Sequence, residues 1–238
     1  MRAWAGVAMA LFATGCSKVE RPRPVASTRS DVSAFASVKN ARESLSARDL
    51  KVTLGSVRPK SDGALGVDDA KVRFVAPDTV ADVAMRFTYV GPSAKEARLA
   101  SGAMRRQVGL KLRAHDGCNV VYVMWRFEPV NELVVSVKSN PGESLHLECG
   151  ASGYTNVKAD RRATMPAIER GSSHAMTARI DGRRLFVTVD GNAAWEGRLP
   201  ESAFLVDGPS GVRTDNVAVD VAFAAMRGKT GDSAGGDD

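Results

Sequence analysis

Short hydrophobic runs, separated by turn-forming residues, recur through the middle of the chain. Eight of these runs are rich in Val, Ile, Phe and Leu, and they occupy residues 71–76, 82–90, 107–113, 119–128, 132–138, 175–180, 184–189 and 217–224. Asp-Gly pairs, which tolerate the positive φ angles of tight hairpin turns, lie between many of them, at 62–63, 116–117, 181–182, 190–191 and 207–208. Many short strands with such turns, and no strong helical stretch between them, predict an all-β sandwich or barrel.

The runs 119–128 and 132–138 predict one β-hairpin in detail. The loop 129–131 between them reads Pro-Val-Asn, which suits a type I turn that closes into a left-handed residue. A three-residue loop sets Glu128 opposite Glu132, and side chains then alternate between the two faces of the hairpin. The loop length therefore decides which residues lie opposite one another.

One face of this hairpin is apolar and the other is mixed. In the predicted register Trp125 lies opposite Val135 on the apolar face, which we expect to be core. The other face gathers one aromatic and three polar residues: Tyr122, Arg126, Ser136 and Lys138. Rings stack on the apolar faces of sugars and polar groups bind hydroxyls, so these four form the candidate ligand-binding site. The alternative is that another strand, or the segment 30–50, packs over this face.

The first residues have the pattern of an export signal. One positive charge at Arg2 precedes the uncharged apolar and small stretch 3–15. This stretch is too short to span a bilayer as an ordinary helix, which needs about 20 residues, and it suits the apolar core of a secretory signal peptide. It ends in Ala13-Thr14-Gly15-Cys16, which resembles the lipobox of bacterial lipoproteins, although that family usually has Leu where Ala13 stands.

The lipobox resemblance implies cleavage before Cys16 and lipid on that cysteine. Each acyl chain gains roughly 0.8 kcal/mol per buried CH₂, so several chains make membrane anchoring effectively permanent. Ser17, rather than Asp, follows the cysteine, which by the family's sorting habit points to the outer membrane. We therefore expect a lipid-anchored protein of the bacterial cell envelope. The alternative is an ordinary signal peptide with a chance cysteine.

Two cysteines, Cys118 and Cys149, remain once lipid occupies Cys16. An oxidising periplasm favours joining them in a disulfide. The bridge would close a loop of about 32 residues, worth roughly 3–4 kcal/mol in the chain-entropy model. The three histidines form no ligand spacing with the cysteines, so we expect no metal site and no cofactor there.

Composition divides the chain into four parts. Residues 1–15 are the expected signal peptide, and 16–49 form a tether with a stretch that suits a short helix. Residues 50–226 form the β-sandwich domain, and 227–238 a Gly-, Asp- and Ser-rich tail that we expect to be disordered. The formal net charge is +6, with basic residues spread along the chain. A nucleic-acid footprint needs clustered charge, so we expect no nucleic-acid partner.

Two segments in the C-terminal part of the sequence resemble those of a known protein family. A strand ending in Val-Asp-Gly at 189–191 is followed by a short returning strand, 194–197, which reads Ala-Trp-Glu-Gly. The segment 208–213, Gly-Pro-Ser-Gly-Val-Arg, then precedes the alternating strand 217–223. These features are similar to those of the concanavalin A-like lectin/glucanase superfamily, which implies a jelly-roll sandwich of two antiparallel sheets. We expect Trp195 to lie in its core.

Function does not follow from this fold, because the superfamily includes sugar binders, glycoside hydrolases and adhesive modules. Its glucanases carry Glu-x-Asp-x-x-Glu on one strand, and that motif is absent from the sequence. Retaining glycosidases need two carboxyls about 5–5.5 Å apart, and the facing Glu128 and Glu132 keep that possibility open. We favour a non-catalytic glycan-binding lipoprotein. The alternatives are a structural or protein-binding envelope lipoprotein and a glycoside hydrolase-like enzyme.

Some relatives bind calcium through clustered Asp and Asn side chains on loops. Four residues here offer suitable oxygens: Asp190, Asn192, Asp215 and Asn216. Nothing in their spacing requires an ion, so the sequence predicts no metal.

Overall fold

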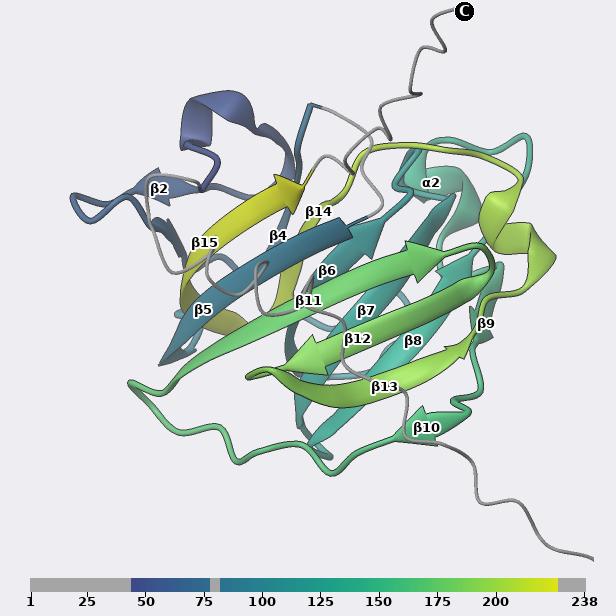
Figure 1. Cartoon of the computed structure of the whole chain (residues 1–238). Coiled ribbons are helices and arrows are strands. Elements are labelled where there is room, and N and C mark those ends of the chain that lie inside the picture. Colours follow the sequence, from purple (N-terminus) through teal and green to yellow (C-terminus); the bar gives the residue numbers. More distant parts are fainter. Residues whose placement is uncertain (1–43, 78–81, 227–238) are drawn as a thin grey trace, which may run out of the picture.

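The computed structural model of the protein describes residues 44–77 and 82–226, which form two stacked β-sheets (Figure 1). The seven-stranded sheet has the order β1 (Lys51–Leu54), β4 (Lys71–Val75), β14 (Gly211–Asp215), β6 (Arg106–Leu112), β7 (Val120–Glu128), β8 (Glu132–Lys138) and β9 (Tyr154–Asn156). The eight-stranded sheet has the order β10 (Arg161–Arg162), β13 (Asn192–Arg198), β12 (Arg184–Val189), β11 (Ser173–Asp181), β5 (Asp82–Pro92), β15 (Val217–Met226), β3 (Leu65–Val67) and β2 (Arg58–Pro59). The paired strands are antiparallel. All eight predicted runs are strands, so the all-β sandwich of two antiparallel sheets is confirmed.

Within the described residues, three short helical turns accompany the strands: η2 (Ala47–Asp49), α2 (His146–Cys149) and η3 (Glu201–Phe204). No helix in the described part of the chain is long and apolar enough to cross a membrane. The end of the predicted tether joins the sandwich, because the backbone N–H of Leu45 donates to the carbonyl of Phe223 at 2.9 Å. The predicted signal peptide, Cys16, most of the tether and the tail at 227–238 lie outside the described residues.

Alternate side chains of the central strands point between the two sheets, because successive residues of a strand face opposite sides. On β7 the inward residues are Val121, Val123 and Trp125, and all three are buried. Trp125 meets Phe87 of β5 edge to face across this interior, with ring centroids 5.6 Å apart. Trp195 of β13 is buried in the same core. The prediction that both tryptophans belong to the core is therefore confirmed.

The β7–β8 hairpin forms with its two predicted faces, but its register is shifted by two residues. Trp125 lies opposite Leu133, so the predicted pairing with Val135 is wrong. The predicted pairing of Glu128 with Glu132 is wrong for the same reason. A shift of two leaves every side chain on its predicted face, because the side-chain period of a strand is two.

Side-chain contacts in the connection explain the shift. Residues 127–131 link the last cross-strand pair, so the connection is longer than the expected three-residue turn. Asn131 Oδ1 accepts a hydrogen bond from the indole Nε1 of Trp125 at 2.8 Å, and its Nδ2 donates to the carbonyl of Pro166 at 2.8 Å. Asn131 therefore satisfies the buried indole donor of Trp125.

The two predicted disulfide partners are bonded. Cys118 and Cys149 form a disulfide with their Cα atoms 5.9 Å apart. This bridge ties the residues that precede β7 to the end of α2, which are 31 positions apart in the sequence. The predicted pairing is confirmed.

Candidate functional site

The four candidate residues lie on the outer face of the seven-stranded sheet, which we define as the side pointing away from the eight-stranded sheet. Tyr122 belongs to a small apolar cluster that is separate from the core between the sheets. Arg126, Ser136 and Lys138 also alternate with core residues on β7 and β8, and so they share this face. The register places Tyr122 opposite Ser136 rather than opposite Lys138.

The ring of Tyr122 is covered by two neighbouring side chains. It is 6% exposed, and the guanidinium carbon of Arg213 lies 4.6 Å from its ring centroid. The ring of Tyr154, on β9, stacks against it at a centroid distance of 6.1 Å and an interplanar angle of 19°. Tyr154 itself is 41% exposed. The aromatic ring available to a ligand on this face is therefore Tyr154, and not Tyr122 as expected.

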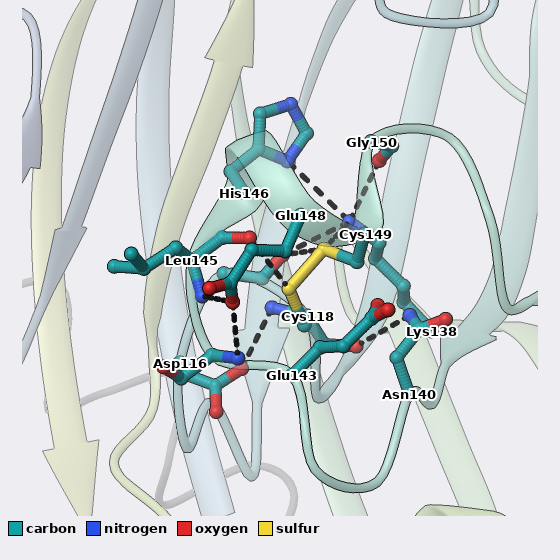
Figure 2. Close-up of a disulfide and its surroundings, with 12 residues drawn as sticks. Asp116, Cys118, Lys138, Asn140, Glu143, Leu145, His146, Glu148, Cys149 and Gly150 are labelled. Carbon is teal, nitrogen blue, oxygen red and sulfur yellow. Dashed lines mark hydrogen bonds between the residues drawn. A yellow bond between two sulfur atoms is a disulfide. The ribbon is translucent and has the colours of Figure 1, made fainter.

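The ammonium group of Lys138 is used within the protein (Figure 2). The side chain is fully buried. Its Nζ donates to the carbonyls of Gly117 at 3.1 Å and Gly150 at 2.8 Å, and it lies 2.9 Å from Cys149 Sγ. These contacts hold both ends of the disulfide-closed loop. Lys138 thus stabilises the loop and offers no free donor to a ligand.

Arg126 lines a hollow of about 480 Å³ whose other lining residues come from β8, from the residues after it and from the eight-stranded sheet; the volume is within the range of about 300–1,000 Å³ for ligand pockets. Its Nη1 donates to Glu132 Oε1 at 3.0 Å, and its buried Nε has no partner in the described structure. Arg162 also lines the hollow. Ser136 is buried beside Tyr122. Of the four candidates, Arg126 keeps unused hydrogen-bonding capacity.

Three cations that sequence reasoning missed lie together on the outer face. Arg73 of β4, Lys111 of β6 and Arg213 of β14 come from neighbouring strands. Lys111 and Arg213 are buried, and the Arg73 side chain is 13% exposed. Asp215, also on β14, accepts hydrogen bonds from Arg73 Nη2, from Arg213 Nε at 2.8 Å and from Gln107 Nε2 at 2.6 Å. We call Arg73, Lys111, Arg213 and Asp215 the cationic cluster. Three positive groups and one carboxylate leave it with unbalanced positive charge.

Burial makes the charges of the cationic cluster act strongly on one another. Burial, together with repulsion from Arg73 and Arg213, lowers the pKa of Lys111 to about 8. Burial acts to raise the pKa of Asp215, but the two arginines and the hydrogen bond from Gln107 hold it below its usual value. Asp215 is therefore a carboxylate at neutral pH, while Lys111 keeps its proton only until slightly above neutral pH.

A charged residue placed between two apolar residues of a strand is the sequence signal that could have located these cations. Arg73 lies between Val72 and Phe74, and Lys111 lies between two leucines, all of which are buried. A charge between two core residues marks the outer face of a strand. The spatial order β4-β14-β6 then brings the charges together. This strand order cannot be inferred from a single sequence.

Glu128 and Glu132 do not form a carboxylate pair. The shifted register sets Glu132 opposite Arg126, with which it forms an ion pair. Glu128 accepts from Arg106 Nη1 at 2.8 Å. Each glutamate is thus held by its own arginine, and the two do not make the facing carboxyls that retaining hydrolysis needs.

The residues considered for calcium have partners within the protein. Asp190 Oδ2 lies 2.7 Å from His174 Nδ1, and Asp215 belongs to the cationic cluster. Within residues 44–77 and 82–226, the acidic, histidine and cysteine groups with metal-ligand spacing are Cys118, Glu143 and Cys149. The two sulfurs of that group form the disulfide, so it does not supply the thiolates that a metal would bind.

No protein-family model matches this sequence, and no curated protein matches it. Among solved structures, the fold is similar to the carbohydrate-binding module CBM66 from Bacillus subtilis, with a TM-score of 0.50 and 11% identity, over 75% of this chain and 94% of that one. It is also similar to the GH43 protein BlXynB from Bacillus licheniformis, with a TM-score of 0.48 and 14% identity, over 79% of this chain and 39% of that one. The carbohydrate recognition domain of Emp46p gives a TM-score of 0.46 and 8% identity, over 74% of this chain and 88% of that one. The first likeness shows a shared β-sandwich fold, and the two weaker ones support no conclusion.

Proposed function

We propose that the protein is an envelope lipoprotein whose β-sandwich binds glycans, without catalysis, on the outer face of the seven-stranded sheet. The observation that carries the proposal is the exposed ring of Tyr154 beside the cationic cluster, with its hydroxyl 3.4 Å from Arg213 Nη1. A ring and fixed polar groups on one rigid sheet are the parts that a sugar site needs. The similar fold of a protein named a carbohydrate-binding module supports the same proposal.

The polar groups beside Tyr154 are held in place in the unliganded protein. Asp215 accepts charged hydrogen bonds from both arginines of the cationic cluster, and Arg73 also donates to the backbone carbonyls of Val72 and Thr214. Groups that are already fixed lose little conformational entropy on binding. A sugar resting on Tyr154 would therefore meet donors that are already oriented.

Docking of an envelope protein is a second candidate function, and the exposed leucines of the disulfide loop favour it. Leu147 of α2 is 96% exposed and Leu145, just before it, is 61% exposed. Exposed apolar side chains are common on protein surfaces, however, and do not by themselves indicate a partner. Tyr154 adjoins charged groups with fixed positions, so glycan binding has the better support.

A comparison of Tyr154→Ala with Leu147→Ala tests the proposal. On a glycan array probed with the full-length protein, Tyr154→Ala should lose about 1 kcal/mol of binding, or roughly fivefold in affinity, because aromatic stacking contributes about 0.5–1.5 kcal/mol. Leu147→Ala removes an almost fully exposed apolar side chain of α2 and should bind as the wild type does. Binding that survives Tyr154→Ala would move the site elsewhere. If no glycan binds, protein docking becomes the better proposal.

A further inference from the structure

Lys111 is a buried cation without an acceptor in the described structure. It is 6% exposed, and no residue in 44–77 or 82–226 accepts a hydrogen bond from its Nζ. Its cross-strand neighbours are Gly211 on β14 and Tyr122 on β7. The Nζ is not among the enclosed side-chain atoms that lack a partner, so it reaches the surface, where an acceptor from outside the chain can contact it.

The nearby carboxylate does not supply that acceptor. Both oxygens of Asp215 are engaged, one by Arg73 and the other by Arg213 and Gln107. The two arginines repel the Lys111 ammonium and lower its pKa. The cationic cluster therefore lacks a counter-charge at the Lys111 end, where burial weakens the screening by water.

The ends of the charged side chains are the groups of the cationic cluster that a ligand could contact. Gly211 lies opposite Lys111, and Gly109 of β6 lies opposite Arg213. Neighbouring backbone fills the space at both glycines, since an added Cβ would lie 2.0 Å from the Phe74 carbonyl oxygen at Gly211 and 2.1 Å from that of Val123 at Gly109. In addition, Arg213 Nη2 has no partner among the described residues and remains available to a ligand.

We propose that Lys111, together with Arg73 and Arg213, binds the carboxylate of an acidic sugar, so that the glycans recognised contain uronic acids. This inference rests on the proposed function and names its ligand class. A planar guanidinium matches the geometry of a carboxylate, and an ammonium supplies a further charged donor. Arg213 contacts both the Tyr122 ring and the Tyr154 hydroxyl, so the carboxylate site adjoins the exposed ring on which the sugar would rest.

Titration calorimetry of the full-length protein tests the inference with two matched probes. The probes are oligomers of galacturonic acid and the corresponding galactose oligomers, in which a hydroxymethyl group replaces each carboxylate. We expect the acidic oligomers to bind at least about tenfold more tightly than the neutral ones, because charged hydrogen bonds are the stronger kind. Lys111→Met should abolish that preference through a loss of affinity for the acidic oligomers. Lys111→Arg, which keeps the charge, should preserve it.

Arg86→Met is the matched control, because Arg86 is an exposed cation on β5 of the other sheet. It removes the same charge from the protein and should leave both affinities unchanged. Equal binding of acidic and neutral oligomers by the wild type, or a preference that survives Lys111→Met, would overturn the inference and leave glycan binding standing. A stronger affinity for sulfated galactose oligomers would overturn the assignment to a carboxylate. Binding of none of these oligomers would overturn the proposed function as well.

The pH dependence of acidic-oligomer affinity separates a role of the Lys111 charge in binding from a purely structural role of this residue. Lys111 faces Arg73, Arg213 and Tyr122 from the neighbouring strands, with Asp215 next to the arginines. Burial raises the pKa of Tyr122, so Lys111 is the group in this set that loses its proton just above neutral pH. Acidic-oligomer affinity should fall by up to about tenfold per pH unit above about pH 8, and neutral-oligomer affinity should not. An acidic affinity that is constant to about pH 9.5 would contradict a role for the Lys111 charge.

Discussion

Lys111→Met should stabilise the protein, although most substitutions at buried positions destabilise. Methionine keeps an unbranched, flexible side chain in the same space and removes a charge that burial and two arginines disfavour. The pKa of Lys111 falls from 10.5 to about 8, and roughly 2.5 pH units at about 1.4 kcal/mol each correspond to about 3.5 kcal/mol. We expect the free energy of unfolding at neutral pH to rise by about 2–4 kcal/mol in the variant.

The stabilisation should depend on pH in a defined direction. The unfolded chain holds the Lys111 proton up to about pH 10.4, whereas the folded chain releases it above about pH 8. Between these values the unfolded state binds more protons, so this residue makes wild-type stability increase with pH. The advantage of Lys111→Met should therefore be complete below pH 8 and vanish toward about pH 10.5.

Urea unfolding in the absence of glycan, at about pH 7, 8.5 and 10, measures this advantage. Arg86→Met serves as the control, because loss of an exposed charge should change the free energy of unfolding by less than about 0.5 kcal/mol. Equal stability of Lys111→Met and the wild type at neutral pH would refute the reasoning. An advantage of the same size at all three pH values would refute it as well, because it would come from packing and not from charge.

Cys16→Ser should abolish palmitate labelling and release the protein from the membrane fraction; unlabelled wild-type protein found free in the periplasm would contradict the anchor. Replacing Cys118 and Cys149 together by alanine should lower the free energy of unfolding by about 3–4 kcal/mol, because the bridge closes a loop of about 32 residues. Urea unfolding checks this, and a loss well below about 1 kcal/mol would contradict it. Asn131→Ala should cost about 1–3 kcal/mol by leaving the buried Trp125 indole N–H unpaired. A loss below about 0.5 kcal/mol in urea unfolding would contradict a role for this hydrogen bond.

The local alternation of apolar and polar residues was enough to predict the strands and which face each side chain occupies. The pattern of apolar and polar residues in 119–138 assigns Trp125 to the core and Arg126 to the outer face, and the structure agrees. The same pattern cannot fix which residues lie opposite one another, because a shift of two leaves both faces unchanged. The register depends on Asn131, whose side chain reaches the Trp125 indole and the Pro166 carbonyl. Such contacts depend on three-dimensional placement that the hairpin sequence does not contain.

The candidate site was only partly predictable because it depends on strand order. Tyr122 was placed on the correct face, but its exposure depends on Arg213 of β14 and Tyr154 of β9. Tyr154 lies in a three-residue strand within a polar segment, where no hydrophobic run indicates a strand. Lys111 and Arg73 are separated by 38 positions in the sequence but belong to strands that flank β14. The positive charges are therefore evenly spread along the sequence, although the strand order of the sheet brings these two close together.

The members of the cationic cluster come from β4, β6 and β14, which lie far apart along the chain. Unfolding separates them, so a ligand that contacts all three strands binds the folded state alone. Such a ligand, at about 100 times its Kd, adds about 2.7 kcal/mol to the free energy of unfolding. For a domain of this size that raises the melting temperature by roughly 5–10 °C. A thermal-shift screen of large glycan collections can therefore report binding without a label, even while the identity of the sugar is still open.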